Sequence, residues 1–580
     1  MRCINLFREI DRIWITEHNS FSFFAYPMNS DKKRLKIVDK EKCAIRTADF
    51  WQVTIRTGGK AMSDLDKMEK SYFRSKLPEF EEKTIAFHNK KMNVKDYKGF
   101  SGKYGSYAQR GGSKHMLRLR MTAGRVTPEK LNFIIEQVHK HHVDLAHFTT
   151  CQAVQFHNLE PEALFDIMDR AIDADIICYG GGGDYPRNVM CSPLSGTEKD
   201  EYFDVIPYAE KTADFLMHYI DREKMPRKLK VAFSNSKANV SHATFRDLGF
   251  VAREDGKFDV YAAGGLGNNH RLGVRVAEGV NPSDILYYVR AMIETFRKYG
   301  NYENRAKART RYMVEALGGE EEFREAYRKE LDAILNSGED YTIKEIEIPV
   351  IDKEPDGDAP ESWRISEQKQ PGLYTVMWHP IGGSPDLEVL EEAAKAIDEM
   401  PQTEMRLSPD ETAYIINLTG KEAEKILEIT EKDAAKNPFE TSISCIGATI
   451  CQVGLRDSQA LLKTVIEAAR EAGIADGALP QIHISGCPSS CGTHQVGEIG
   501  FRGFLKMVDK KPLPAFLMYE YGDDRQGEER FAKEVGVVLQ SDIPALLVEL
   551  GRKVMDSGLT WKEWVKANPD GIRETAAQWL

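Results

Sequence analysis

The feature that most constrains the fold of this 580-residue chain is a repeat at the scale of half the chain. The first copy has a strand pattern at residues 117–121, a helix start at Thr127, and a second strand pattern at 153–157 before a second amphipathic helix. The second copy keeps this order, with strand patterns at 373–378 and 412–418. Such a half-unit leaves a sheet edge open, so we expect the two copies to pair into one composite sheet covered by helices.

The segments that follow the two half-units also repeat, and they differ where chemistry is concerned. Residues 233–250 align with residues 484–501. The alignment pairs two thiols with side chains that do not bind soft metals: Cys487 with Ser236, and Cys491 with Val240. A metal centre built on these thiols is therefore expected in the second copy alone.

Four cysteines of the second copy have the spacing of ligands to one soft-metal centre. Five residues separate Cys445 from Cys451, and three separate Cys487 from Cys491 in the stretch Gly-Cys-Pro-Ser-Ser-Cys-Gly. Neither pair is a two-residue knuckle, so the pattern favours an iron-sulfur cluster over zinc. A structural zinc site and unrelated buried thiols remain the alternatives.

Composition and charge exclude several classes of function. Every apolar stretch is interrupted by charges well before the roughly 18 residues that a membrane span needs. A net charge of -11 argues against a general nucleic-acid binder. Nine cysteines are too few for a disulfide scaffold in a chain of this length and fit reduced thiols. We therefore expect a cytoplasmic protein that binds neither membranes nor nucleic acids.

The N-terminal stretch differs from the rest of the chain. Residues 1–61 show no sustained helical or strand periodicity, and Glu9, Asp11 and Arg12 interrupt the apolar core that a secretory signal would need. A charged helical pattern opens at Met62. Met62 is therefore a second candidate for the start of the native protein.

Two strand patterns and one loop place cations where a small anion would bind. Strand alternation sends Lys228 and Lys230 to one face and their apolar neighbours to the other. Arg118 lies in a similarly alternating strand, and Arg187 follows four glycines that would let the backbone approach a bulky ligand. Each pattern taken alone fits a solvated edge as well as a site.

A basic run at residues 305–311 has a cation at every second position. If the run is helical, Arg305 and Arg309 share one face. A solvated helix face is the default interpretation of such a run. The carboxylates of a large cofactor are the sharper alternative.

Several motifs together resemble one family. The likeness spans roughly residues 95–580 and rests on Gly-Lys-Tyr-Gly-Ser-Tyr-Ala-Gln-Arg110, Pro-Arg-Asn-Val189, Pro-Arg-Lys-Leu-Lys230 and the two cysteine motifs. This combination resembles the siroheme-containing sulfite and nitrite reductases, which take electrons from ferredoxin or a flavoprotein. The resemblance implies an α+β fold with a pseudo-twofold duplicated chain, in which two ferredoxin-like half-units pair into one domain beside two related α/β domains of the siroheme/4Fe-4S type.

The repeat and the resemblance together predict the domain boundaries. Residues 338–372 are rich in Glu, Asp, Pro and Gly, which is typical of a solvated linker. The expected parts are an N-terminal extension at 1–95, half-unit 1 at 96–175, a siroheme and substrate domain without a cluster at 176–337, the linker at 338–372, half-unit 2 at 373–435, and a 4Fe-4S and siroheme domain at 436–580.

The resemblance also implies roles for individual residues. A 4Fe-4S cluster would be bound by Cys445, Cys451, Cys487 and Cys491, and Cys491 would also bridge to the siroheme iron. Four cations would surround the open axial position of the siroheme, offset the charge of the anion and help its oxygen leave as water: Arg118, Arg187, Lys228 and Lys230. Siroheme contacts are implied for Cys491, Gln155, Asn188, Arg227, Arg305 and Arg309.

One motif departs from the family pattern. The family sequence Thr-Thr-Arg-Gln or Thr-Asn-Arg-Gln reads Thr149-Thr150-Cys151-Gln152 here, so a cysteine replaces an arginine that would contact siroheme carboxylates. Either another cation, such as His147 or Arg227, compensates for it or the cofactor contacts differ. We expect Cys151 to be a free buried thiol rather than a redox-active one.

The expected function is the six-electron reduction of sulfite to sulfide at a siroheme coupled to a 4Fe-4S cluster. Family members acting on sulfite resemble this chain in having two lysines, whereas those acting on nitrite often have asparagine in place of Lys230. No Gly-x-Gly-x-x-Gly opens a helix after a strand, so electrons are expected from a partner, ferredoxin first and a flavoprotein second. The rivals are an ammonia-forming siroheme nitrite reductase and a non-catalytic zinc-binding protein.

Overall fold

The computed structural model describes residues 13–18, 20–25 and 69–580, and the chain divides into the units Met1–Asp64 and Leu65–Leu580. In the first unit, strands β1 (Ile13–His18) and β2 (Ser20–Ala25) pair antiparallel. This hairpin lies within residues 1–61, for which no sustained strand periodicity was predicted, because each strand has only six residues. The expectation for Met62 lies outside the described residues.

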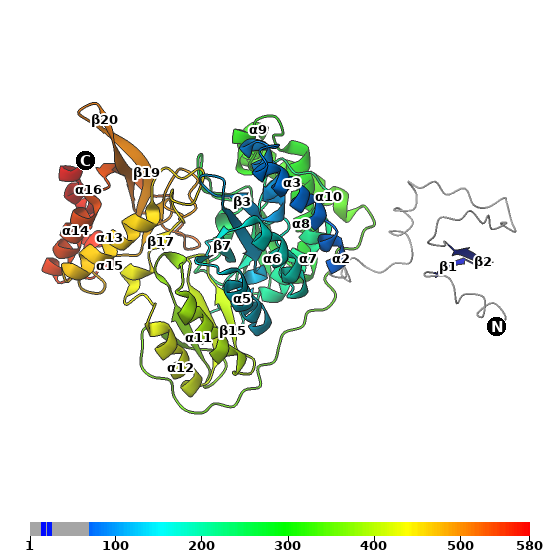
Figure 1. The fold of residues 1–580 in the computed structure, drawn as a ribbon, viewed down its shortest axis with the longest axis horizontal. Helices are drawn as coiled ribbons and strands as arrows, with labels where there is room; N and C mark the ends of the chain where they lie inside the picture. The colour runs from blue at the N-terminus through cyan, green and yellow to red at the C-terminus, as the bar shows by residue number, and fades with distance from the viewer. Residues whose placement is uncertain (1–12, 19, 26–68) are drawn as a thin grey trace. The chain divides into compact units, whose positions relative to one another are not determined.

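The first half-unit forms a four-stranded sheet in the order β3-β4-β7-β6, with helices packed against it (Figure 1). Both of its long helices begin at a proline after an extended residue, where the fixed φ and missing N–H of proline cost nothing. The predicted strands and the helix start after Thr127 are confirmed. The elements are β3 (Ser106–Ala108), β4 (His115–Arg120), α5 (Pro128–His141), β6 (Ala146–Phe148), β7 (Ala153–Leu159) and α6 (Pro161–Asp173).

The second half-unit has a five-stranded sheet in the order β13-β14-β16-β15-β5. Its edge strand β5 (Arg125–Val126) comes from the first half-unit and pairs antiparallel with β15, Val126 opposite Met405. The expected single composite sheet is therefore wrong: there are two sheets, linked by a two-residue strand. The other elements are β13 (Ile365–Glu367), β14 (Tyr374–Trp378), α11 (Leu387–Asp398), β15 (Glu404–Leu407), β16 (Ala413–Leu418) and α12 (Gly420–Glu431).

One hydrophobic core joins the two half-units. Helices α5 and α11 lie against each other (Figure 1), and the core includes Ile134 from the first and Ile397 from the second. The rings of Phe148 and Trp378 meet edge to face with their centroids 6.0 Å apart. Because neither half-unit has a core of its own, the two fold as one domain.

Two further sheets repeat the same topology. In each, three strands run parallel and two more extend the sheet antiparallel, giving the orders β8-β9-β10-β11-β12 and β17-β18-β19-β20-β21. The first has β8 (Met190–Cys191), α7 (Ile206–His218), β9 (Val231–Ser234), β10 (Leu248–Ala252), β11 (Phe258–Ala262), β12 (Val274–Val280) and α8 (Ile285–Tyr299). The second has β17 (Ile443–Ser444), α13 (Ser458–Glu471), β18 (Ile482–Ser485), β19 (Ile499–Val508), β20 (Lys511–Glu520), β21 (Lys533–Leu539) and α14 (Ile543–Ser557).

The remaining helices lie before, between and after these sheets. They are α2 (Lys70–Arg74), α3 (Leu77–His88), α4 (Val94–Ser101), α9 (Arg311–Leu317), α10 (Glu320–Leu335), α15 (Trp561–Ala567) and α16 (Gly571–Ala576). In the part of the chain that the structure describes, none of the helices has both the length and the apolar character needed to cross a membrane.

Hydrogen bonds exchanged between the two repeats hold them together. Gln495, in the loop after β18, accepts a hydrogen bond from the Gly267 amide at 2.7 Å and donates to the Gly267 carbonyl at 3.1 Å. In return, the Asn239 amide group in the loop after β9 donates to the Asp524 carbonyl at 2.6 Å. His242 also contacts the Asp524 carboxylate at 2.9 Å. The loops that leave β9 and β18 are thereby fixed against the opposite repeat.

The linker between the repeats is held at several points. Ile343 is buried and its amide bonds to the Ser283 carbonyl at 2.8 Å. Lys353 is nearly buried and donates to Thr403 at 2.9 Å and to the Asn417 carbonyl at 2.8 Å. Strand β13 also falls within residues 338–372. The expectation of a solvated linker is therefore wrong at these contact points, where Ile343 is held by the first repeat and Lys353 by the second half-unit.

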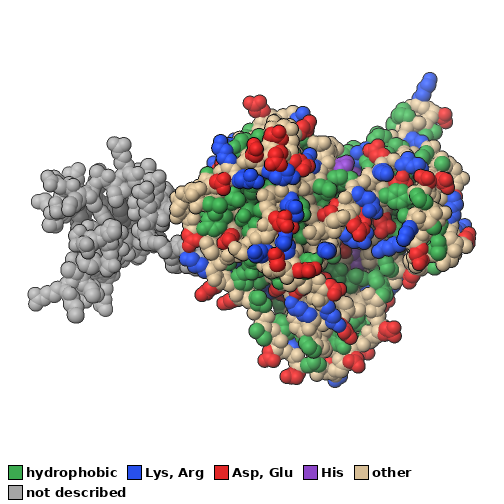
Figure 2. Space-filling model, turned by 180° about the vertical axis from the view of Figure 1, so that it is seen from behind, with side chains coloured by type: hydrophobic (Ala, Val, Ile, Leu, Met, Phe, Trp, Pro, Cys, Tyr) green, Lys and Arg blue, Asp and Glu red, His purple; other side chains and the backbone are tan. Residues whose placement is uncertain are grey.

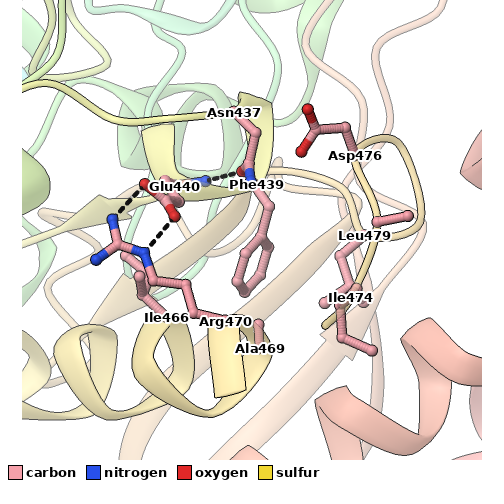
Figure 3. Close-up of a pocket in the computed structure, with 10 residues that line it drawn as sticks. Asn437, Phe439, Glu440, Ile466, Ala469, Arg470, Ile474, Asp476 and Leu479 are labelled. Atoms are coloured by element: carbon pink, nitrogen blue, oxygen red, sulfur yellow. Dashed lines mark hydrogen bonds and ion pairs between the residues drawn. The ribbon is translucent and has the colours of Figure 1, made fainter. Parts of the chain in front are cut away.

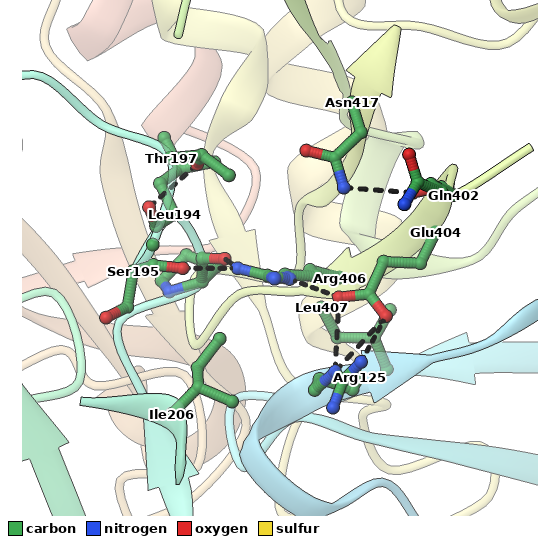
Figure 4. A network of polar contacts seen from close by, with 12 residues as sticks. Arg125, Leu194, Ser195, Thr197, Ile206, Gln402, Glu404, Arg406, Leu407 and Asn417 are labelled. Carbon is green, nitrogen blue, oxygen red and sulfur yellow. Dashed lines mark hydrogen bonds and ion pairs between the residues drawn. The ribbon is translucent and has the colours of Figure 1, made fainter. Parts of the chain in front are cut away.

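A buried carboxylate connects the half-units to the first repeat (Figure 4). Glu404 accepts hydrogen bonds from Arg125 at 2.8–3.1 Å and from Arg406 at 2.7 Å. Arg406 in turn donates to the Pro193 and Ser195 carbonyls, in the loop after β8. Burial opposes ionisation of Glu404, but the guanidiniums of Arg406 and Arg125 lower its pKa to about 2.

Replacing Glu404 by glutamine should destabilise the protein by about 3 kcal/mol, because the buried Arg406 guanidinium loses its carboxylate partner, whereas Arg125 keeps Glu210. The measurement is the midpoint of thermal unfolding at neutral pH. Because the folded pKa is depressed, the stabilisation is present above the unfolded pKa of about 4.3 and should vanish as the pH falls towards 2. Glu399→Gln, on an exposed ion pair with Lys425, is the control, and an equal loss in both variants would contradict the account.

Candidate active site

The two cysteine pairs lie at the carboxyl ends of neighbouring parallel strands. Cys445 follows β17 directly, and Cys487 lies two residues beyond β18. The Gly486 amide donates to the Cys445 sulfur at 3.2 Å, and Ser458 Oγ lies 3.2 Å from the same sulfur. The carboxyl ends of adjacent parallel strands meet at one edge of a sheet, so the two pairs converge there.

The glycines beside the cysteines are required by packing. A Cβ on Gly492 would lie 2.0 Å from the Ile484 carbonyl oxygen, and one on Gly486 would lie 2.5 Å from the Arg456 carbonyl oxygen. Both distances are far inside van der Waals contact, so no other residue fits. The cysteine loops are therefore packed against the sheet without any side chain between them.

The thiols are not arranged as ligands of a single ion. Among the described residues, no three His, Cys, Asp or Glu side chains converge on one point. A tetrahedral zinc site needs such convergence, with each sulfur about 2.3 Å from the metal. In a 4Fe-4S cluster each thiolate binds a different iron, so the sulfurs stand further apart. The described side chains thus form no ready site for a single ion, and a cluster bound by the four thiols stays a prediction.

Cys491 faces both the other thiols and the lysines. Burial raises its pKa to about 12, and Cys445 and Cys487 add to this, while Lys228 and Lys230 act in the opposite direction. Cys491 is nevertheless accessible to solvent, so it is not part of a packed core. The thiol is protonated until a metal displaces its proton.

Lys228 has no hydrogen-bond acceptor for its ammonium group among the residues that the structure describes. Burial lowers its pKa well below the usual value, and the neighbouring charges of Arg309, Lys230 and Arg187 lower it further. A buried ammonium among like charges is unfavourable unless an anion joins it. The site is therefore prepared for a negatively charged ligand.

Arg118 and Arg187 converge on the glycine-rich loop. Both donate to the Gly181 carbonyl, and Arg187 also donates to the Gly183 carbonyl at 2.8 Å. With its amide oxygen turned towards Arg118, Gln155 accepts two hydrogen bonds from that guanidinium at 2.6 and 3.0 Å. The loop carbonyls thus orient two of the predicted catalytic cations.

Several buried polar atoms near these cations have no partner among the described residues: Arg187 Nε, Arg309 Nε, Arg311 Nη1 and Asn188 Oδ1. Three of them are guanidinium donors. Unpaired buried donors are costly and call for an acceptor that is not part of the chain. The carboxylates of a siroheme would supply such acceptors, so the donor set fits that cofactor.

The basic run 305–311 is not a continuous helix, so the expected shared face of Arg305 and Arg309 is wrong. A 3-10 turn covers Arg305–Lys307, and α9 begins only at Arg311. Arg309 turns inwards to the buried Asp247 carboxylate, with both contacts at 3.0 Å. Arg305 is exposed and pairs with Asp184.

Two hollows lie outside this cluster of thiols and cations. One, of about 720 Å³, is lined by Arg227 and Arg305, which share Asp184, together with Lys98 and Lys224. The other, between α13 and the loop after it, is only about 30 Å³ and lies beside the Glu440–Arg470 ion pair (Figure 3). None of the predicted site residues lines the smaller hollow.

The two cations named as replacements for the missing arginine at Cys151 differ in charge and pairing. Burial, together with Arg118, lowers the pKa of His147 to about 4, so it is neutral at pH 7. Arg227 is paired with Asp184. Sequence reasoning missed the buried Arg246, one of the cations whose charge acts on Cys151.

A second missed residue is Asp247, which fixes the backbone at Lys230, just before β9. Its carboxylate accepts from the Lys230 amide at 2.8 Å and from Arg309. One signal was available in the sequence. An acidic residue precedes the corresponding strand in both repeats, as Asp247 and Glu498.

Comparisons with known proteins agree with this arrangement. The family model described as "Nitrite and sulphite reductase 4Fe-4S domain" matches residues 182–335, and "Nitrite/Sulfite reductase ferredoxin-like half domain" matches residues 107–174. The first match covers the repeat that lacks the four cysteines.

Relatives and a solved structure extend the likeness over most of the chain. The chloroplastic ferredoxin–nitrite reductase of Arabidopsis thaliana is 25% identical over 451 residues, 73% of this chain and 74% of the relative. Sulfite reductase [ferredoxin] 1 of Mycolicibacterium paratuberculosis is 26% identical over 380 residues, 62% of this chain and 64% of the relative. The structure of Mycobacterium tuberculosis NirA has the same fold, with a TM-score of 0.70 at 22% identity over 83% of this chain and 92% of that one. The chain is therefore similar, over these matched residues and in its fold, to the nitrite and sulfite reductases, which are oxidoreductases that carry siroheme and a 4Fe-4S cluster.

Proposed function

We propose that the protein reduces sulfite to sulfide in six one-electron steps, with ferredoxin as the electron donor. The observation that carries the proposal is the ammonium group of Lys228, which has no acceptor among the described residues. It lies close enough to Lys230, Arg187, Arg309 and Cys491 for their charges to act on it. A small anion with several oxygens would satisfy such a cluster of donors.

The proposed roles follow from the donor chemistry. Cys445, Cys451, Cys487 and Cys491 would hold the 4Fe-4S cluster, which stores and delivers electrons when bound. Arg118 and Arg187 are already oriented by the glycine-rich loop and would bind the oxygens of the anion. Lys228 has a depressed pKa and would give up a proton readily, so it would protonate an oxygen that leaves as water.

Sulfite is preferred over nitrite because of the second lysine. Relatives at this level of identity are named for both substrates, so their names do not choose between them. Sulfite brings three oxygens and, when fully ionised, two negative charges, and two lysines beside two arginines offset these better than one lysine would. Reduction of nitrite to ammonia is the second candidate, favoured by the number of relatives with that name.

The surface around the Cys451 loop suits an electron-donor protein. Val453 and Leu455 of this loop are 53% and 52% exposed, and Arg456 binds the Phe504 carbonyl of the neighbouring hairpin at 2.7 Å. That hairpin, β19–β20, projects from the molecule and carries basic side chains at its tip (Figures 1 and 2). Exposed apolar groups beside a hairpin with basic side chains at its tip fit an acidic partner such as ferredoxin.

Replacement of Cys487 by serine should abolish the cluster, because a hydroxyl does not replace a thiolate as an iron ligand. The measurement is the iron content and visible absorption of the purified protein. Cys178→Ser is the control, since that buried thiol lies outside the proposed ligand set. A Cys487→Ser protein with full iron content would show the ligand assignment to be wrong.

Lys230→Asn should lower kcat/KM for both substrates, and the factor for sulfite should be about ten times the factor for nitrite. This ratio corresponds to ~1.4 kcal/mol in transition-state binding. Both rates are measured with a reduced dye as the donor. Lys224→Asn, in the separate hollow near Arg227, is the matched control and should leave both rates unchanged. Equal losses for the two substrates in Lys230→Asn would remove the reason for preferring sulfite.

A double substitution of Leu505→Glu and Met507→Glu on the projecting hairpin should raise KM for reduced ferredoxin by about fivefold or more, because two carboxylates would repel an acidic partner. Turnover with a small dye should be unchanged. Leu335→Glu, at the exposed end of α10, controls for a general effect of surface charge. An unchanged KM for ferredoxin would place the donor on another surface.

A further inference from the structure

The Cys151 sulfur lies within the cluster of cations and accepts a hydrogen bond from the Lys230 ammonium group at 3.1 Å. This is the position at which the family pattern has an arginine. The neighbouring Lys228 ammonium has no such partner among the described residues. The two adjacent lysines are therefore unequal, and a sulfur atom makes the difference.

The surroundings favour a charged form of the Cys151–Lys230 pair. Burial on its own would raise the pKa of Cys151, but Lys230, Arg246 and Arg118 outweigh it and lower the pKa to about 6. Arg187 also lies close enough to interact with this thiol. The proton therefore resides on the Lys230 nitrogen at neutral pH, opposite a thiolate.

Cys151 is held firmly in place. Its carbonyl accepts a hydrogen bond from the Asn188 amide group at 3.0 Å, and its side chain packs against the small apolar cluster of Met190 and Ala232. The other side of the Asn188 amide, Oδ1, is buried without a partner among the described residues, which marks an adjoining place for a ligand. The sulfur is thus fixed between an apolar wall and Lys230.

We propose that Cys151 is a positioning residue that holds Lys230 in an ion pair. A bound anion then shares Lys230 with the thiolate, whereas it does not share Lys228 with any acceptor among the described residues. The inference rests on the proposed function only in that the cluster of cations binds a small anion. An arginine at this position would add a positive charge where the thiolate adds a negative one. The chain therefore binds anions less tightly than the family pattern would, and releases them more easily.

Two variants of the holoenzyme test the proposed ion pair. Cys151→Ser keeps nearly the shape of cysteine but removes the negative charge, and Cys151→Asp keeps a negative charge but changes the shape. The hydroxyl of serine does not ionise, so KM for the anion that is turned over should fall by about threefold or more. The carboxylate of aspartate should pair with Lys230 and leave KM within about twofold of the wild type. A merely structural cysteine predicts the reverse, with serine near wild type and aspartate impaired, and that outcome would overturn the proposal.

A second measurement does not depend on turnover. Alkylation of Cys151 by iodoacetamide at pH 7, followed by mass mapping of the peptide, reports the thiolate directly. Labelling in the wild type should be about fivefold faster than in Lys230→Asn or Lys230→Gln, since either variant removes the cation that stabilises the thiolate. Equal alkylation rates in all three proteins would show that Cys151 and Lys230 do not form an ion pair. A preference for nitrite over sulfite would defeat the proposed function and leave this result unaffected.

Discussion

The active site depends on the exchange of hydrogen bonds between the two repeats. Gln495 reaches Gly267 in the first repeat, and Asn239 and His242 reach Asp524 in the second. These contacts hold the carboxyl end of β9 opposite that of β18. The lysines come from one repeat and the thiols from the other, so neither repeat alone contains the site.

The second constraint is the cost of gathering like charges away from water. Four cations have pKa values that burial lowers: Arg187, Arg246, Lys228 and Lys230. The charges of Lys228 and Lys230 also act on Cys491. Such an arrangement is stable only if other interactions of the fold offset its unfavourable free energy. Asp247 and the carbonyls of the glycine-rich loop balance part of the charge. The remaining imbalance is what binds an anion and makes lysine a ready proton donor.

The parts of this picture that were predictable are those set by local pattern. Cysteine spacing and the alignment of Ser236 with Cys487 predict a cluster in the second repeat. The strand predicted over Lys228 and Lys230 begins only after them, at Val231, although the charges of the two lysines do act on each other. The partners of these groups were not predictable. Strand β5 crosses to the other half-unit, and Arg309 turns to Asp247, 62 residues away, because tertiary packing determines those directions. Arg246 was missed for the same reason.

The central claim is that thiols and cations from the two repeats form one site for sulfite reduction. It is tested most directly by anaerobic turnover of the purified holoenzyme with a reduced dye, measuring dye oxidised and sulfide formed together. The account predicts about six electrons consumed per sulfide released, with kcat/KM for sulfite about tenfold or more above that for nitrite. A holoenzyme that reduces nitrite faster, or forms no sulfide, would contradict it.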